Sequence, residues 1–201
     1  MVFKEGNTLS TISEAKNILA SATIEERIPR EFGLYDLGEF LSTVSLVKNP
    51  DLDLGAASVK ISGEDSDSIE YFYSNAETLT YPQKAVNMPK PEVTFTLTAD
   101  VLNRIKKAAG VLGHATVQFT GNKGKVTCQV VDAKNATANK YSIVLPDTVD
   151  YKEKFAFTMS ISNLKIFPGD YTVACSTKSI SHFKNNSAPV EYWIALEKPA
   201  A

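Results

Sequence analysis

A pattern of one strand, one helix and three strands recurs along this chain, and the repeat constrains the fold more than any other feature. Its clearest copy begins at Val93–Leu97, where apolar residues alternate with threonines as in a half-buried strand. Apolar residues then recur at helical spacing from Val101 to Leu112. Thr98 is the predicted N-cap of this helix, and Gly113 is the residue that ends it. The strands that follow are predicted over Thr116–Thr120, Lys125–Asp132 and Lys140–Leu145, with Gly121-Asn122-Lys123-Gly124 as a hairpin turn.

Two further copies flank the first. In the earlier copy, the strand Phe32–Tyr35 leads to Asp36, the predicted N-cap of a helix that ends at Val47. The strands of that copy are predicted over Leu52–Leu54, Ser58–Ser62 and Ile69–Tyr73. In the later copy, the strand Phe155–Met159 precedes a short helix, Ser160–Phe167, whose predicted buried side carries Ile161, Leu164 and Phe167. Its strands are predicted over Tyr171–Thr177, Ile180–Lys184 and Val190–Leu196.

Upstream of these copies, only the three strands of a fourth copy are found, over Met1–Lys4, Leu9–Ser13 and Ala15–Ile24. The segment Ala15–Ala22 taken alone is equally compatible with a helix, because alanine and leucine favour helices, but the repeat favours a strand. The prolines of Pro82–Pro91 predict a stiff, extended linker. We therefore expect an α+β fold of two domains, 1–81 and 92–201, joined by residues 82–91. Each is built from β-α-β-β-β units, and the first lacks its opening strand and helix.

The charge of the chain is segregated along the sequence. A net charge of -2 argues against a simple nucleic-acid binder. Residues 64–77 nevertheless carry only acidic charges, whereas residues 98–125 carry mainly basic ones. No uncharged stretch is long enough to cross a bilayer, so no membrane partner is expected. Cys128 and Cys175 lie in apolar runs without metal-ligand spacing, which predicts buried free thiols.

No constellation of residues predicts catalysis. His114 and His182 lack a cysteine or carboxylate at metal-ligand spacing, so both are expected to be structural or surface residues. The glycine-rich turn at 121–125 lacks the spacing and the final Ser or Thr of a phosphate-binding loop. Neither G-x-S-x-G nor HExxH occurs. We expect a protein that is not an enzyme and that has no cofactor and no metal.

Three motifs add a family resemblance to the repeat. They are Leu34-Tyr35-Asp36-Leu37-Gly38-Glu39-Phe40-Leu41 with Ser45-Leu46-Val47, Phe167-Pro168-Gly169-Asp170-Tyr171, and Tyr192-Trp193-Ile194-Ala195-Leu196-Glu197. In order and spacing, over essentially the full chain, they resemble the sliding clamps of DNA replication, and most closely the clamp of T-even-type tailed bacteriophages. That family begins with one more strand and helix. We therefore expect this chain to be a fragment or to start at an internal methionine.

The resemblance implies a DNA-clamp fold with helices on the inner face and sheets outside. It also implies a homotrimeric ring that surrounds duplex DNA irrespective of sequence and tethers the replicative DNA polymerase. The implied partners further include an ATP-dependent clamp loader and late-transcription factors, and the implied location is the cytoplasm of the infected bacterial host. Two other classes are weighed against it: a β-rich phage tail or capsid accessory protein, and a hydrolase whose site is assembled from dispersed residues. A ring trimer distinguishes the clamp from a structural protein that forms a filament.

Candidate DNA contacts are cations on the predicted helices. On the helix 99–112, Arg104 and Lys107 project opposite the apolar face and Lys106 lies on its flank. Lys165 and Lys48 repeat the positive charge at equivalent places in the other copies. Long cationic side chains without a base-reading set attract phosphate at any register, which suits sliding. The alternative is an ordinary solvated basic face.

The resemblance also implies an apolar pocket for a peptide of the polymerase and subunit contacts between strand edges. Alternation puts Trp193 and Ala195 on one face of the last strand, so Trp193 is the candidate anchor; a buried structural tryptophan is the alternative. The candidate pocket is Val86, Met88, Trp193, Ala195 and Leu196. The candidate interface residues on the two predicted edge strands are Ile69, Tyr71, Tyr73, Tyr141, Ile143 and Leu145.

Overall fold

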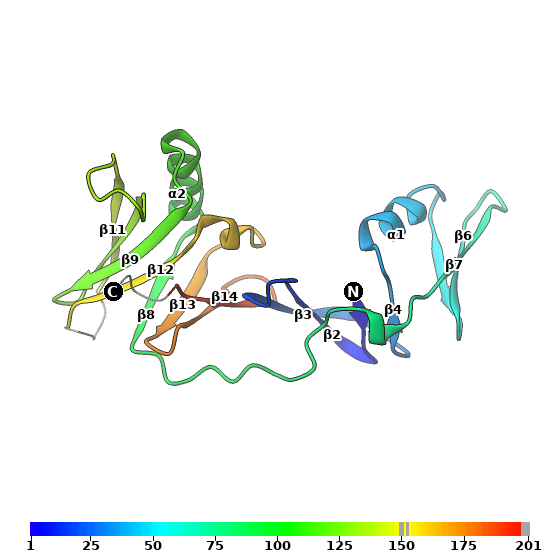
Figure 1. Cartoon of the computed structure of the whole chain (residues 1–201). Coiled ribbons are helices and arrows are strands. Elements are labelled where there is room, and N and C mark those ends of the chain that lie inside the picture. The colour runs from blue at the N-terminus through cyan, green and yellow to red at the C-terminus, as the bar shows by residue number, and fades with distance from the viewer. Residues whose placement is uncertain (149–150, 152, 198–201) are drawn as a thin grey trace. The chain divides into compact units, whose positions relative to one another are not determined.

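The computed structural model describes residues 1–148, 151 and 153–197, and the chain divides into two compact units (Figure 1). The first unit comprises residues 1–14 and 21–83, and the second comprises residues 15–20 and 84–201. The division between residues 83 and 84 falls within the predicted linker. Residues 15–20 were predicted to belong to the first domain. They lie in the second unit, because they extend a sheet of the second unit. The last residues of the predicted second domain, 198–201, lie outside the described residues.

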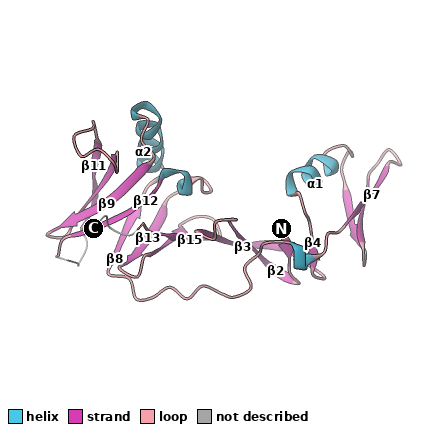
Figure 2. Cartoon of the chain, in the orientation of Figure 1, coloured by secondary structure: helices cyan, strands magenta, loops and turns pink. Residues whose placement is uncertain are grey.

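The second unit contains two consecutive copies of the predicted repeat (Figures 1 and 2). The first copy consists of β8 (Val93–Leu97), α2 (Ala99–Leu112), β9 (Thr116–Asn122), β10 (Lys125–Val131) and β11 (Tyr141–Thr148). The second consists of β12 (Phe155–Ser160), the 3-10 helix η2 (Ile161–Leu164), β13 (Tyr171–Ser176), β14 (Ile180–Asn185) and β15 (Val190–Ala195). The elements therefore follow the order expected from the sequence.

The strands of the second unit form two antiparallel sheets. One sheet has the order β11-β10-β9-β12, so β11 is at its edge. In the other, β8, β13, β14 and β15 lie side by side. The beginning of β3 (Ile18–Ile28) lies next to β15, and Ala195 N donates to the Asn17 carbonyl over 2.8 Å. The hairpin between β9 and β10 turns through Lys123 and Gly124, whose φ angles of 53° and 81° are the left-handed values that a two-residue hairpin turn needs.

The core of the second unit is enclosed by both sheets and by α2. Phe119, Tyr171 and Phe183 are among its fully buried side chains. Both ends of α2 are capped as predicted: the Thr98 hydroxyl accepts from Val101 N, and Gly113 adopts a left-handed conformation with φ 68°. These interactions fix where α2 starts and stops, and hence which of its residues face solvent.

The first unit contains one copy of the repeat and the three strands that precede it. The preceding strands are β1 (Val2–Phe3), β2 (Gly6–Ile12) and β3. The copy consists of β4 (Phe32–Gly33), α1 (Leu37–Val44), β5 (Asp51–Leu54), β6 (Ser58–Ser62) and β7 (Ser68–Phe72), followed by the 3-10 turn η1 (Ala76–Thr78). β5, β6 and β7 form an antiparallel sheet with β7 at an edge, and β1 pairs with β4. Its smaller core gathers around Phe32, Leu34, Phe40, Val59 and Ile61.

Two local expectations were tested by these elements. Residues from Ile18 onward form a strand and not a helix, as the repeat indicated. The predicted helix over 160–167 was wrong in length and type, because the segment forms a tight 3-10 turn that ends at Leu164, with Lys165 as its C-cap. The change of register after this turn buries Ile166 and leaves Phe167 54% exposed, which contradicts its predicted place on the buried side.

Candidate functional site

Helix α2 presents a cationic surface opposite the face that it buries. Val101, Leu102, Ile105 and Ala109 are buried, and Lys107 is exposed on the far side. Lys106 lies half-buried on the flank, and desolvation by burial lowers the pKa of its ammonium group. The predicted distribution of these cations on α2 is therefore present in the structure.

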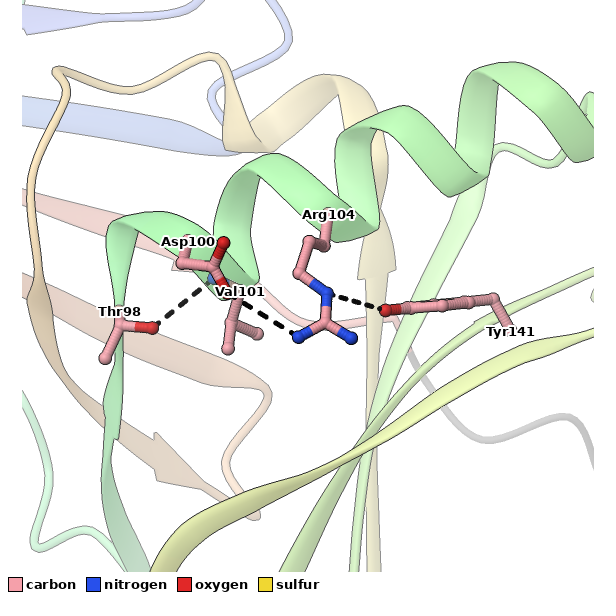
Figure 3. A network of polar contacts seen from close by, with 5 residues as sticks. All are labelled: Thr98, Asp100, Val101, Arg104 and Tyr141. Atoms are coloured by element: carbon pink, nitrogen blue, oxygen red, sulfur yellow. Dashed lines mark hydrogen bonds and ion pairs between the residues drawn. The ribbon is translucent and has the colours of Figure 1, made fainter.

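Arg104 is held by two side chains (Figure 3). Its Nε donates to the Tyr141 hydroxyl over 3.1 Å, and its Nη1 lies 3.5 Å from Asp100 Oδ2. The hydrogen bond to Tyr141 is the largest cause that raises the pKa of the guanidinium, so this group stays charged. Tyr141 is the first residue of β11, so this contact joins α2 to an edge strand.

The segment from η2 to Asp170 runs alongside α2. At one end, Ile161 N donates to the carbonyl of Ala115, just beyond the C-terminus of α2, over 2.8 Å. At the other end, Asp170 Oδ1 accepts from Ala99 N, at the N-terminus of α2, over 2.7 Å. Lys165 lies between these two points and is exposed. Neither Lys107 nor Lys165 takes part in an ion pair among the described residues. The structure therefore brings these two lysines and Arg104 onto neighbouring elements of one unit.

Lys48 differs from the other candidate cations. It belongs to the first unit, and its Nζ lies 3.2 Å from Glu64 Oε2. Glu64 also accepts from the Asn49 amide, and this hydrogen bond, followed by the one from Lys48, lowers the pKa of the Glu64 carboxyl. The charge of Lys48 is thus already partly neutralised within its own loop.

Trp193 lies on the face of its sheet that is opposite the core. Its neighbours in sequence, Ile194 and Leu196, are buried on the core side, and Ala195 is exposed. The indole stacks on the His182 ring at 4.9 Å between centroids, and His182 Nε2 lies 2.8 Å from Glu191 Oε2. The indole Nε1 is buried without a hydrogen-bond partner. Trp193 therefore presents a half-buried aromatic ring on the outer face of its sheet.

The other candidate pocket residues are more dispersed. Leu196 faces the core and does not share the face of Trp193, because side chains alternate along the strand. It lines a separate cavity of about 170 Å³ together with Phe155, Phe157 and Ser179. Val86 and Met88 are half-buried in the segment that precedes β8. Sequence reasoning treated His182 as a structural or surface histidine and did not link it to Trp193, although its register opposite Trp193 follows from pairing β14 with β15.

The predicted edge strands are edges, but the predicted interface side chains point inward. Ile69, Tyr71 and Tyr73 pack against the core of the first unit. Tyr141 and Ile143 pack against the core of the second unit, and Leu145 is buried in it. The large apolar side chains that face outward are Phe72, 65% exposed, and Val144, 60% exposed. The sequence pattern therefore identified the edge strands, and the residues that it selected on them face the cores of their units.

The described residues contain no group of three or more His, Cys, Asp or Glu side chains that could hold a metal ion. No described helix combines the length and the apolar character needed to span a membrane. His114, whose ring nitrogen lies 2.7 Å from the Asn139 carbonyl oxygen, has a structural contact.

Comparisons with known proteins agree with this geometry. A family model described as "gp45 sliding clamp, C terminal" matches residues 94–198. The chain is 32% identical to the sliding clamp of Vibrio phage KVP40 over 202 residues, which cover 98% of this chain and 90% of that protein. It is 28% identical to the sliding clamp of Escherichia phage RB69, with 98% and 88% covered.

Solved structures extend the likeness to more distant proteins. Proliferating cellular nuclear antigen from Entamoeba histolytica matches with a TM-score of 0.68 at 12% identity, over 98% of this chain and 88% of that one. The Helicobacter pylori beta clamp bound to a DNA ligase peptide matches with a TM-score of 0.71 at 16% identity, over 98% and 56%. At these identities the likeness concerns the fold alone, and the predicted clamp fold is confirmed.

Proposed function

The chain belongs to the family of phage sliding clamps, and from this premise we propose which of its residues meet DNA, a neighbouring subunit and a polymerase. The predicted function as a DNA sliding clamp is confirmed by this membership. Sliding clamps are processivity factors and not enzymes, and they work as ring oligomers with DNA and a polymerase as partners. The alternatives of a structural phage protein and of a hydrolase are therefore set aside.

The DNA-facing surface that we propose consists of α2 and the segment that begins at η2. The observation that carries this proposal is that Lys107 and Lys165 are both exposed and without an ion pair among the described residues, and that hydrogen bonds join the segment of Lys165 to both ends of α2, which also carries Arg104. Such side chains attract phosphates electrostatically and make no base-specific pattern, so they hold the ring near DNA while it slides. Lys106 adds a weaker contact from the flank, and Lys48 adds one from the first unit.

The experiment replaces Lys107 and Lys165 together by alanine and measures binding to a linear duplex with free ends, onto which a ring can thread. Each lost phosphate contact should make the slope of log K against log salt shallower by about 0.9. The weakening should be the same for unrelated duplex sequences. Lys184→Ala is the matched control, because Lys184 is exposed on β14, on the face of the strand opposite buried Phe183 and Asn185. An unchanged slope, or a loss that depends on sequence, would contradict the assignment.

We propose that three copies close the ring by pairing β7 of one subunit with β11 of the next. Both strands are sheet edges with unpaired backbone groups, which is the usual basis for adding a strand from another chain. The outward side chains Phe72 and Val144 are the apolar contacts that such pairing would cover.

The oligomeric state tests this interface. Phe72→Glu or Val144→Glu should convert the ring to monomers, as measured by the mass in solution, because a charge would be buried against an apolar neighbour. Val111→Glu serves as the control, since Val111 is 78% exposed on α2 and not on an edge strand. A ring of unchanged mass in both edge variants would refute the pairing.

We propose that the face of Trp193 and Ala195 receives a short peptide of the replicative polymerase, with Val86 and Met88 as a second wall. Leu196 would contribute from the adjacent cavity. That the Helicobacter pylori clamp binds a DNA ligase peptide supports peptide docking on this fold.

Trp193→Ala should weaken peptide binding more than tenfold, because loss of a central aromatic anchor costs about 2 kcal/mol or more. The melting temperature is measured on the same preparation. A large fall in melting temperature, with normal binding by the remaining folded protein, would make Trp193 a structural residue.

The remaining partners follow from the clamp function. A closed ring must be opened to enclose circular DNA, so we propose that an ATP-dependent clamp loader acts on this protein in the cytoplasm of the infected bacterium. Late-transcription factors are proposed as further users of the Trp193 face. Competition between the polymerase peptide and these proteins for the same clamp would test whether they share that surface, since independent binding sites would show none.

A further inference from the structure

Tyr141 lies where two functional regions of the second unit meet. It opens the edge strand β11, and its ring packs against the main core. Its hydroxyl accepts the hydrogen bond from Arg104 Nε on α2 (Figure 3). Packing against the core and pairing in the strand do not require the Tyr141 hydroxyl, so its hydrogen bond to the Arg104 guanidinium indicates a further role.

Arg104 has donors to spare after this contact. A guanidinium carries five N–H groups in a fixed plane. Nε is directed at Tyr141, and Nη1 lies near Asp100, one helical turn earlier (Figure 3). The side chain of Arg104 is 52% exposed, so the other N–H groups remain accessible. Arg104 can therefore keep its bond to Tyr141 while it contacts a phosphate.

The neutral hydroxyl and the carboxylate act differently on this cation. Asp100 orients Arg104 but offsets part of its charge, as Glu64 does for Lys48. Tyr141 orients the guanidinium and leaves its charge intact. An arginine that is oriented in advance loses less side-chain entropy when it meets a phosphate, so a fixed arginine binds more tightly than a free one.

We propose that Tyr141 is a positioning residue for DNA binding, which fixes the Arg104 guanidinium for contact with the phosphates of the duplex. This role rests on the proposed DNA-facing surface of α2. It replaces the subunit-interface role that the sequence pattern assigned to the Tyr141 side chain.

A double-mutant cycle in the full chain tests this role, using a linear duplex of mixed sequence and salt from about 50 to 200 mM. Tyr141→Phe keeps the ring and removes the hydroxyl, so it should weaken DNA binding by about two- to tenfold, the effect of one net hydrogen bond. The salt slope should not change, because no charge is lost. Arg104→Ala should weaken binding further and make the slope shallower. In the Arg104→Ala background, Tyr141→Phe should have no additional effect.

Two further variants separate positioning from folding. Arg104→Lys keeps the charge but lacks Nε, so it should reproduce the loss seen with Tyr141→Phe at an unchanged slope. Tyr35→Phe is the control, because Tyr35 is 80% exposed in the first unit. Melting temperature and ring mass are measured for every variant.

The proposal is overturned if Tyr141→Phe binds DNA normally, or if it weakens binding equally with and without Arg104. A different outcome would refute the proposed DNA-facing surface as well. If Arg104→Ala and the Lys107/Lys165 double variant both bind DNA normally, α2 and the η2 segment do not face DNA, and both proposals are wrong. If those variants lose binding while Tyr141→Phe does not, only the role of Tyr141 is refuted.

Discussion

The two units of this clamp share one order of elements and differ in what their helices carry. Helix α2 has 14 residues, buries a continuous apolar stripe and exposes cations. Helix α1 has 8 residues, buries only Phe40, and carries Glu39 but no lysine or arginine. On α1 the exposed apolar residue Leu41 faces solvent, 57% exposed. The same topology therefore supports a basic surface in one unit and an acidic, apolar one in the other.

This difference shows that topology and surface chemistry are specified by separate sets of residues. The inward positions of both copies keep the strand and helix periods, and this is enough to build the repeat. The outward positions do not have to follow the apolar period, so their residues can be selected for what each unit contacts. For a protein that acts by binding, the outward residues of α2 say more about function than its core does.

The largest effect that we expect concerns thiol labelling in the second unit. Both cysteines, Cys128 and Cys175, are fully buried in the second unit, and desolvation raises the pKa of each to about 12. At pH 8 their alkylation should be at least about a thousandfold slower than that of a free thiol, because the thiols react only after the unit opens. Mass spectrometry after iodoacetamide treatment measures the rate. Fast labelling of either cysteine would show that the second unit opens readily around its thiols.

The raised thiol pKa values also set a direction for alkaline stability. Each folded pKa lies above the ordinary value, so the thiols contribute stability that is complete at pH values below about 9. This contribution is lost as the pH rises from about 9 towards 12, where only the unfolded chain ionises. Between pH 9 and 12, the alkylation rate of the protein should therefore rise more steeply than the alkylation rate of a free thiol. If the two alkylation rates rose in parallel, ionisation of the buried thiols would not be coupled to unfolding.

Truncation of one core phenylalanine in each unit sharpens the comparison. Phe119 is fully buried, whereas Phe40 is 8% exposed and packs edge-on against Tyr71. Removing a buried phenylalanine costs about 3–5 kcal/mol, and we expect Phe119→Ala at the upper end and Phe40→Ala at the lower. Hydrogen exchange resolved by unit measures each loss separately. If Phe40→Ala destabilised its unit more than Phe119→Ala destabilised the other, the ranking of the cores would be wrong.

Two glycines should respond to alanine with opposite signs. At Gly63, an added Cβ would lie 2.5 Å from the Lys48 carbonyl oxygen, a backbone atom that cannot easily move, so Gly63→Ala should cost about 1–3 kcal/mol. At Gly110 of α2, nothing lies within 4 Å, and alanine should stabilise the helix by about 1 kcal/mol. Urea unfolding of both variants checks the signs. A stabilising Gly63→Ala would show that the Lys48 loop is not rigid.

The smallest expected effect concerns Lys48, the candidate DNA contact in the first unit. Lys48→Ala should reduce duplex binding less than Lys107→Ala, because Glu64 already holds the Lys48 ammonium at 3.2 Å. An exposed ion pair of this kind contributes only about 0–1 kcal/mol, so removing Glu64 is tolerated. In the Glu64→Gln background, Lys48→Ala should then have a larger effect on DNA binding. If Lys48→Ala already equalled Lys107→Ala in the native background, the two lysines would not differ as proposed.

Local features of this fold were predictable where the chain itself sets the geometry. Thr98 and Gly113 bound α2 because caps act within a few residues, and the turn at Lys123-Gly124 follows from the same short-range rule. The length of η2 was not predictable, because buried Leu164 and Ile166 satisfy the core through a tighter turn. The repeat, a longer signal, settled the strand at Ile18 where propensity did not.

The candidate site was predictable in its charges but not in its pairings. Lys107 and Arg104 follow from helical periodicity, since a face opposite an apolar stripe is exposed. The bond between Arg104 and Tyr141 joins residues far apart in sequence, and no local pattern indicates it. The outward orientation of Phe72 and Val144 was not predicted for a related reason: an edge strand with apolar residues on both faces leaves open which set points outward.

The placement of residues 15–20 in the second unit has a consequence for the order of synthesis. These residues leave the ribosome early, but β15, their neighbour in the sheet, is among the last elements to be made. The sheet of the second unit therefore gains this strand only when translation is nearly complete, and contacts of such long sequence separation form slowly. Until β15 is made, residues 15–20 cannot join this sheet. A deletion near the start of the gene would thus damage the half of the protein that is encoded near its end.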